Sequence, residues 1–212
     1  MIEKTTLIAI DDHPLFRKGV ADLVGMEPSL ELVGEAASGP EGIELATRLN
    51  PDLILLDMNL PGMDGIAILK ALKERELDAR VVMLTVSDSE ENIVAALRAG
   101  ADGYLLKDME PEDILDRLRA AAGGKLVLSD RVTELLARTL REDAPPRTRE
   151  EAQLTERETE ILAAVADGQS NKMIARRLQI SEGTVKVHVK HLLKKLNLRS
   201  RVEAAVWAIK QQ

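Results

Sequence analysis

Three carboxylates in the first half of the chain follow short apolar runs. Asp57 ends the run at 53–56, and the pair Asp11–Asp12 follows the run at 7–10. A short apolar run between turn signals is typical of a strand buried on both faces, and the carboxyl ends of parallel strands border the crevice where such sheets bind ligands. Carboxylates gathered there repel one another unless a cation joins them, and their hard oxygen atoms suit Mg²⁺.

Two further polar residues end the next two apolar runs. Thr85 is near the end of the run at 81–86, and Lys107 comes just after the run at 103–106. Beside Mg²⁺, the Asp57 carboxylate can accept a phosphoryl group, while Lys107 neutralises phosphate oxygens and Thr85 donates a hydrogen bond to one. Taken singly, each of these residues has an ordinary role as a cap or a surface charge, and we interpret His13 as structural. Their convergence favours the phosphoryl-accepting site.

The elements that must bring these residues together alternate regularly along the chain. Strands are expected at 7–10, 30–36, 53–57, 81–86 and 103–106, and helices at 14–24, 41–49, 66–77, 89–99 and 111–122. Five strand–helix units in succession predict an α/β fold, a doubly wound parallel sheet of five strands covered by helices on both faces. All the polar residues named above then lie at one edge of that sheet.

Composition narrows the function further. The chain has no cysteine, which excludes disulfides, thiolate catalysis and cysteine metal sites. It shows neither a signal peptide nor a membrane-spanning segment, so we expect a cytoplasmic protein without a membrane partner. The net charge of −7 hides an asymmetry: residues 147–212 carry 13 basic and 8 acidic residues, net +5, and the remainder carries 16 and 28, net −12. This asymmetry indicates an acidic domain joined to one that binds nucleic acid.

The chain divides into three parts. Residues 1–125 form the α/β domain, residues 126–153 a linker that contains a helix with apolar residues from Val132 to Leu140, and residues 154–212 an all-α domain. Thr155-Glu-Arg-Glu158 and Ser200-Arg-Val-Glu203 predict capping boxes, and Ser170 and Ser181 predict caps of the two helices between them. Two helices joined by a short turn suggest a helix-turn-helix.

The helix that follows Ser181 carries the candidate DNA contacts. Its inner face holds Val185, Val189, Leu192 and Leu196, and we place His188 toward that side. The opposite face has positive or potentially positive side chains and no acid, an arrangement that fits phosphates and guanine edges, with a valine for a thymine methyl. The predicted contacts are Thr184, Lys186, Val187, Lys190, His191 and Lys194. The ordinary alternative is a solvated charged face.

These residues give the chain a family resemblance. Residues 1–125 resemble the receiver domain of two-component response regulators, through Asp11–Asp12, Asp57, Thr85 and Lys107, and through Tyr104 three residues before that lysine. The resemblance implies a flavodoxin-like sheet with Asp57 as the phosphoacceptor for a sensor histidine kinase. It implies that Lys107, Thr85 and Tyr104 form the switch, and that Mg²⁺ is held by Asp11, Asp12, Asp57 and the main-chain carbonyl of Asn59.

The second domain resembles the LuxR/FixJ-type helix-turn-helix over residues 154–209. The matching stretches include Asn171-Lys-Met-Ile-Ala175 and Thr184-Val-Lys-Val-His188. Longer stretches, such as 107–112, 171–177, 184–191 and 200–207, are closer still to the nitrate/nitrite-responsive members of the NarL/FixJ family. The resemblance implies that Lys186, Val187 and Lys190 face the bases of double-stranded DNA.

The expected function is therefore a phosphorylation-controlled transcription regulator, active in nitrate/nitrite-responsive gene control. It is not an enzyme, although it assists its own dephosphorylation. It pairs as a homodimer on DNA through its last helix, and RNA polymerase is a further partner. Attraction between the acidic and basic domains is expected to mask the DNA-binding helix until phosphorylation. One alternative is a phosphorylated module for protein or RNA contacts. The other is a Mg²⁺-dependent aspartyl-phosphate phosphotransferase, which would need a second Asp where Asn59 stands.

Overall fold

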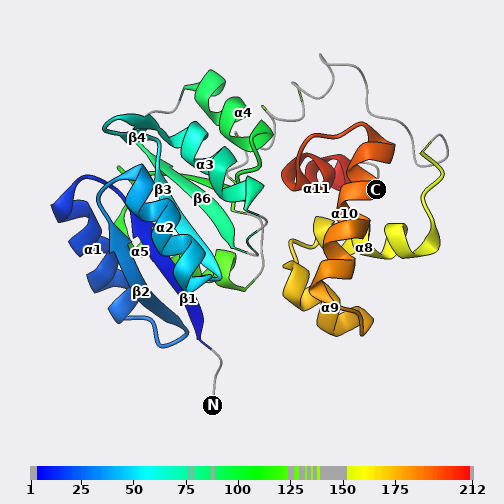
Figure 1. Cartoon of the computed structure of the whole chain (residues 1–212), viewed down its shortest axis with the longest axis horizontal. Coiled ribbons are helices and arrows are strands. Elements are labelled where there is room, and N and C mark those ends of the chain that lie inside the picture. The colour runs from blue at the N-terminus through cyan, green and yellow to red at the C-terminus, as the bar shows by residue number, and fades with distance from the viewer. Residues whose placement is uncertain are drawn as a thin grey trace. The chain divides into compact units, whose positions relative to one another are not determined.

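A computed structural model describes most of the chain, as two compact units (Figure 1). It describes residues 4–75, 77, 79–86, 89–123, 127–128, 132, 135, 138 and 152–210. The first unit spans Met1–Gly123 and the second Gly124–Gln212. Most of the expected linker at 126–153, including most of its helix, lies outside the described residues; Val132 and Leu135 are described, helical and buried.

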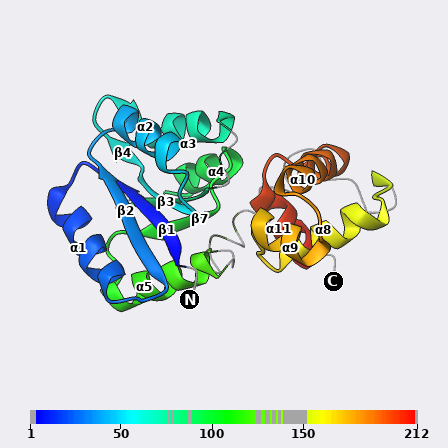
Figure 2. The ribbon, with the colours of Figure 1, turned by 60° about the horizontal axis from the view of Figure 1, so that its bottom comes forward.

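The first unit is the predicted α/β fold. Its strands are β1 (Thr5–Ile10), β2 (Leu30–Ala36), β3 (Leu53–Asp57), β6 (Arg80–Thr85) and β7 (Gly103–Leu106). They form a parallel sheet in the order β2-β1-β3-β6-β7. Its helices are α1 (Pro14–Gly25), α2 (Gly39–Leu49), α3 (Gly65–Glu74), α4 (Glu90–Arg98) and α5 (Pro111–Ala122). Helices α1 and α5 cover one face and α2, α3 and α4 the other (Figures 1 and 2). The predicted fold class is confirmed.

One small element had not been expected. After β3 the chain forms a hairpin of two short strands, β4 (Asn59–Leu60) and β5 (Met63–Asp64). Pro61 and Gly62 make its two-residue turn, and Gly62 adopts φ +79°, the left-handed conformation that a type II turn requires at its second central residue. Two-residue strands are too short to show an alternating pattern, so the sequence revealed the turn but not the pairing.

The strand register places the functional positions at one level. Ile10 of β1 pairs with Leu56 of β3, so Asp11 and Asp57 are each the next residue on neighbouring strands. Thr85 pairs with Leu106 at the ends of β6 and β7, and Lys107 follows. The sheet below is apolar: Ile8, Ile10, Ile54 and Leu56 have no exposed surface. The core therefore fixes the strand ends rigidly against one another.

The second unit is helical throughout its described part. It contains α8 (Glu156–Ala166), α9 (Asn171–Leu178), α10 (Glu182–Leu196) and α11 (Arg201–Lys210). Thr155 and Glu158 form the predicted capping box of α8, and Ser170 and Ser181 cap α9 and α10 as predicted. At the start of α11, Ser200 Oγ accepts a hydrogen bond from Glu203 N, which is one half of the predicted capping box. The other half differs, because the Glu203 carboxylate accepts a hydrogen bond from the main-chain N–H of Arg199, one residue before Ser200.

A single apolar core holds these helices together. Ile161, Ile174, Val185, Leu192 and Leu196 have no exposed surface and pack in this core with Trp207 of α11. Within the part of the chain that the structure describes, no helix has both the length and the apolarity to cross a bilayer.

Candidate functional site

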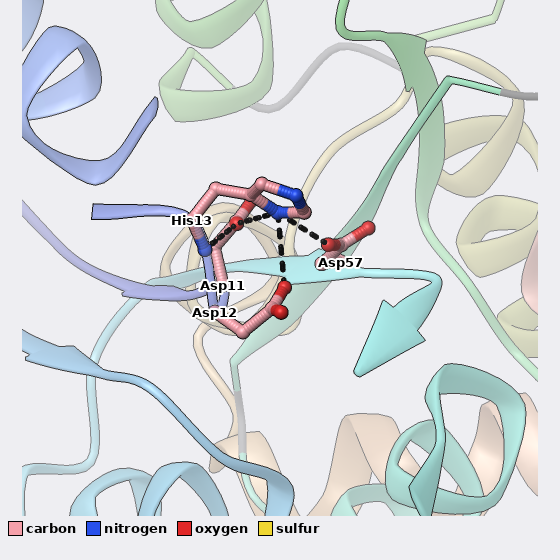
Figure 3. Close-up of side chains that lie close together, drawn as sticks. All are labelled: Asp11, Asp12, His13 and Asp57. Atoms are coloured by element: carbon pink, nitrogen blue, oxygen red, sulfur yellow. Dashed lines mark hydrogen bonds and ion pairs between the residues drawn. The ribbon is translucent and has the colours of Figure 1, made fainter. Parts of the chain in front are cut away.

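The acidic pocket lies at the carboxyl ends of β1 and β3. Asp11 and Asp57 are each 1% exposed, and Asp12 is partly exposed above them. The structure therefore brings together the three carboxylates singled out in the sequence (Figure 3). Gly65 makes this arrangement possible at the start of α3, because a Cβ atom there would lie 2.6 Å from the carbonyl oxygen of Asp57 and 2.7 Å from Met58 Cα.

Lys107 is the basic residue of this pocket. Its Nζ lies 2.7 Å from Asp57 Oδ2, to which it donates a hydrogen bond, and 2.7 Å from Asp11 Oδ2. The side chain is 8% exposed, so this is a largely desolvated ion pair and not a surface charge. Lys107 and Asp57 are therefore neighbours, as predicted. The ammonium group contacts the carboxylate that is expected to receive the phosphoryl group.

The predicted switch residues and the fourth predicted metal residue surround the same strand ends. Thr85 has no exposed surface and Tyr104 is 5% exposed. Thr85 directly follows Leu84, the residue of β6 that pairs with Asp57. The main-chain carbonyl of Thr85 accepts a hydrogen bond from Lys107 N at 2.8 Å. Asn59, in β4, donates its main-chain N–H to Asp57 Oδ1 at 3.2 Å.

Helix α1 supplies contacts that the sequence did not reveal. His13, interpreted from sequence as structural, has its imidazole Nδ1 at 3.0 Å from Asp12 Oδ1 and 3.3 Å from Asp11 Oδ1. Lys107 Nζ lies 4.9 Å from the centroid of the Phe16 ring. Arg17 Nη1 donates to the main-chain carbonyl of Asp11 at 2.5 Å. Only the position of His13 next to the acid pair could have suggested such a contact.

The donor set fits a hard divalent cation. Asp11, Asp12 and Asp57 carry three negative charges, and Lys107 returns one positive charge. Asp11 Oδ2 has Lys107 Nζ at 2.7 Å as its charged neighbour, but Asp12 Oδ1 is buried and accepts no hydrogen bond in the described structure. Buried oxygens of this kind are costly unless a cation satisfies them, and carboxylate oxygens are ligands that Mg²⁺ prefers.

The second candidate surface is the outer face of α10. Val185, Leu192 and Leu196 are fully buried, and Val189 packs against the same core, as predicted. His188, placed toward the inner side, is half-buried. Of the predicted contacts, Lys186 is half-buried, Val187 is 52% exposed, and the others are exposed: Thr184, Lys190, His191 and Lys194.

The N-terminus of α10 is firmly held. Ser181 Oγ accepts a hydrogen bond from Thr184 N at 3.0 Å and lies 2.8 Å from Thr184 Oγ1. The turn before it begins at Gln179, which adopts φ +55° at the end of α9. A capped helix whose exposed face is basic and whose opposite face is buried in a rigid core is the geometry by which a recognition helix enters a major groove.

Both units match known families. Residues 7–119 match the response regulator receiver domain, and residues 152–208 match the bacterial regulatory proteins of the luxR family. The chain is 57% identical over 205 residues to the nitrate/nitrite response regulator protein NarL of Escherichia coli (strain K12), across 97% of this chain and 95% of that protein. It is 47% identical over 206 residues to the nitrate/nitrite response regulator protein NarP of the same strain, across 97% and 95%.

Solved structures show the same likeness. The receiver domain of a putative response regulator NarL from Mycobacterium tuberculosis is 38% identical, with a TM-score of 0.56, and covers 58% of this chain and 99% of that one. The response regulator ChrA of a heme-sensing two-component system is 34% identical, with a TM-score of 0.52, across 98% of both chains.

Proposed function

This chain belongs to the two-component response regulators with a LuxR-type DNA-binding domain, and we propose that phosphorylation of Asp57 switches its control of transcription. One observation carries the proposal. The Asp57 carboxylate is buried at the end of the central strand β3, bonded to Lys107 at 2.7 Å and adjacent to the acid pair. A buried carboxylate with a cation at hand and two acidic neighbours is poised to be a phosphoryl acceptor.

The proposed transfer is a displacement at phosphorus. An Asp57 carboxylate oxygen attacks the phosphorus of a phosphohistidine on the sensor kinase. The new P–O bond forms as the P–N bond breaks, and the released imidazole nitrogen takes up a proton. Lys107 Nζ, already on the Asp57 carboxylate, neutralises the phosphoryl oxygens. Asp11, Asp12, Asp57 and the Asn59 carbonyl would hold Mg²⁺, which supplies further positive charge beside those oxygens.

The conformational change then involves Thr85 of β6 and Tyr104 of β7. The new charge on Asp57 draws the Thr85 hydroxyl toward the phosphoryl oxygens, and Tyr104 repacks in the space behind it. Thr85 and Tyr104 are buried on adjacent paired strands, which supports their acting together. The same pocket, with Lys107 and the acid pair, would admit a water molecule that hydrolyses the aspartyl phosphate and resets the switch.

The readout is binding of duplex DNA by α10. Lys186, Val187 and Lys190 are proposed to meet base edges, while Thr184, His191 and Lys194 contact phosphates. A homodimer formed through α11 would place two such helices on two half-sites, from which the protein could contact RNA polymerase. Such a regulator acts in the cytoplasm, where the DNA is. Its likeness to two nitrate/nitrite response regulators supports a role in nitrate/nitrite-responsive gene control.

A duplex-DNA binding measurement tests the switch. The full-length protein is titrated in Mg²⁺ with and without beryllofluoride, which stands in for a phosphoryl group, beside Asp57→Asn and the exposed-site control Asp22→Asn. Wild type and Asp22→Asn should bind more tightly when activated, and Asp57→Asn should not respond. Equal binding in every sample would remove phosphorylation as the switch and leave a DNA-binding protein.

A second measurement tests the recognition helix. Lys186→Ala should cost roughly 1–3 kcal/mol of specific binding free energy, whereas Lys70→Ala, an exposed lysine of the receiver, should leave it unchanged. An unchanged affinity and salt dependence in Lys186→Ala would exclude that residue as a DNA contact. An RNA competitor in the same assay tests the RNA-binding alternative, because RNA that displaced the protein more effectively than the same amount of unrelated duplex DNA would favour RNA as the ligand.

A further inference from the structure

The imidazole of His13 lies at the mouth of the acidic pocket and faces its carboxylates. Its Nδ1 lies 3.0 Å from Asp12 Oδ1, 3.3 Å from Asp11 Oδ1 and 4.0 Å from Asp57 Oδ2, and Figure 3 shows the ring turned toward all three carboxylates. One atom from each of these four residues lies within 4.8 Å of the others. The pocket thus offers a nitrogen donor in addition to its oxygen donors.

The main chain at His13 is held by a hydrogen bond, and its ring is open to solvent. His13 N donates to Asp11 Oδ1 at 2.8 Å, and the residue caps the start of α1 just before Pro14. The side chain is 66% exposed, so solvent and ions reach the ring. The backbone therefore keeps the imidazole at the mouth of the pocket, where an entering ion can reach it.

The distances suit coordination. Metal–nitrogen and metal–oxygen bonds of about 2.1 Å place two ligand atoms on one ion at most about 4.2 Å apart. The observed span of 4.8 Å needs only a small closure of exposed side chains. His13 is exposed and Asp12 is partly exposed, whereas Asp11 and Asp57 form the buried base of the pocket.

We propose that His13 is a metal ligand that makes this pocket selective for first-row transition ions such as Co²⁺ or Ni²⁺ over Mg²⁺. The inference rests on the proposed function in one respect: the carboxylates must form a cation site. Imidazole nitrogen binds these ions strongly and adds little for Mg²⁺, which prefers oxygen. His13 therefore determines which ion the pocket prefers, while the carboxylates determine whether it binds one.

The ordinary alternative is that His13 only pairs electrostatically with the acids. In that case its removal would change the binding of every divalent ion by a similar factor, because a charge does not distinguish between ions of equal charge. A nitrogen ligand acts differently, since its loss affects the transition ions alone and removes a direct bond that spectroscopy detects. The two cases therefore differ in two independent readouts.

The experiment uses the full-length protein and two histidine variants. Calorimetric titrations with Mg²⁺ and Co²⁺ are made on the wild type, on His13→Gln, and on the control His188→Gln, a half-buried histidine of α10. Pulsed electron paramagnetic resonance on the Mn²⁺ form then measures the coupling to imidazole nitrogen. We expect wild type and His188→Gln to show the coupling. His13→Gln should lose it, should lose on the order of tenfold or more in Co²⁺ affinity, and should change little toward Mg²⁺.

Two results would overturn the inference: absence of nitrogen coupling in the wild type, or its persistence in His13→Gln. An equal change of Co²⁺ and Mg²⁺ affinity in His13→Gln, in either direction, would also overturn it, in favour of the electrostatic alternative. The variant Asp57→Asn distinguishes a failure of this inference from a failure of the proposed function, because its affinity should fall for both Co²⁺ and Mg²⁺. If Asp57→Asn bound both ions as the wild type does, the carboxylates would not form the cation site at all.

Discussion

The aromatic ring of Phe16 lies 4.9 Å from the ammonium nitrogen of Lys107, although the two residues belong to opposite ends of the receiver sequence. Phe16 is on α1 and Lys107 follows β7. The face of an aromatic ring is electronegative and attracts a cation, more strongly where water is excluded. Helix α1 therefore helps to hold the lysine that contacts Asp57.

This contact predicts a measurable coupling. In a double-mutant cycle of Phe16→Leu and Lys107→Met, the coupling free energy should be about 0.5–2 kcal/mol in favour of the native pair. Urea unfolding of the receiver can be followed in the full-length protein through Tyr104, the single tyrosine, while the single tryptophan, Trp207, reports on the other unit. A coupling of less than about 0.3 kcal/mol would mean that the ring acts only by apolar packing.

Arg17 should support the metal site through the main chain. Its guanidinium donates to the Asp11 carbonyl at 2.5 Å and lies 3.4 Å from Glu35 of β2, so it fixes the turn from which the acid pair projects. Arg17→Gln should lower Mg²⁺ affinity by on the order of tenfold, as loss of an outer support does. Lys18→Gln removes the same charge from the exposed neighbouring position. Removal of a positive charge by itself should not lower Mg²⁺ affinity, so an equal loss in Lys18→Gln would contradict the role assigned to the Arg17 contacts.

The sequence predicted the position of every strand of the five-stranded sheet, and all of them except β2 (Leu30–Ala36), which contains two glutamates, are marked by apolar runs. The convergence of Asp11, Asp57 and Lys107 could be predicted from those strand ends, because the register of the parallel strands places the three residues at the same edge of the sheet. The contacts of His13, Phe16 and Arg17 could not be predicted in this way. They depend on the rotation of α1 about its axis and on the turn after β1, which packing decides.

The helical unit was predictable for a different reason. Its capping residues carry their signal locally: Thr155, Ser170 and Ser181 each accept a hydrogen bond from an N–H three residues later, which the spacing alone indicates. Glu203 shows the limit of that reasoning. Its carboxylate reaches the N–H of Arg199 instead of the capping residue, a choice that depends on how the chain enters α11.

Glu27 should remain ionised in unusually acidic solution. Hydrogen bonds from Arg119 and then from Ser29 lower its pKa from 4.5 to about 2. Because the folded pKa is depressed, the stabilisation is complete above pH 4.5 and is lost as the pH falls from 4.5 to about 2. A carbon-13 titration of the Glu27 carboxyl should show no midpoint near 4.5 in the wild type.

Two variants test which hydrogen bond lowers the Glu27 pKa more. Arg119→Gln should return the Glu27 pKa most of the way to its ordinary value and so weaken the loss of stability in this pH range. Ser29→Ala, which removes only the hydroxyl donor at 2.7 Å, should move the pKa less. A larger effect from Ser29→Ala than from Arg119→Gln would contradict the assignment of Arg119 as the main cause.

Thr155 should contribute to the stability of the DNA-binding unit without touching DNA. Glu158 N donates to Thr155 Oγ1 at 3.2 Å, and Thr155 N donates to the Glu158 carboxylate at 2.9 Å. Burial opposes ionisation of Glu158, but hydrogen bonds from Lys195 and Thr155 outweigh it and lower the pKa of that carboxyl. Thr155→Ala should therefore cost about 1 kcal/mol of unfolding free energy, as loss of a helix cap does.

Thr155→Ser keeps the hydroxyl oxygen and should stay close to the wild type. Trp207, packed in the same core as α8, reports the transition by fluorescence. Specific DNA affinity, measured well below the transition, should be the same for all three proteins, because the capping box stabilises α8 and leaves the exposed face of α10 unchanged. A loss of affinity in Thr155→Ala at full folding would instead place the start of α8 in the DNA interface.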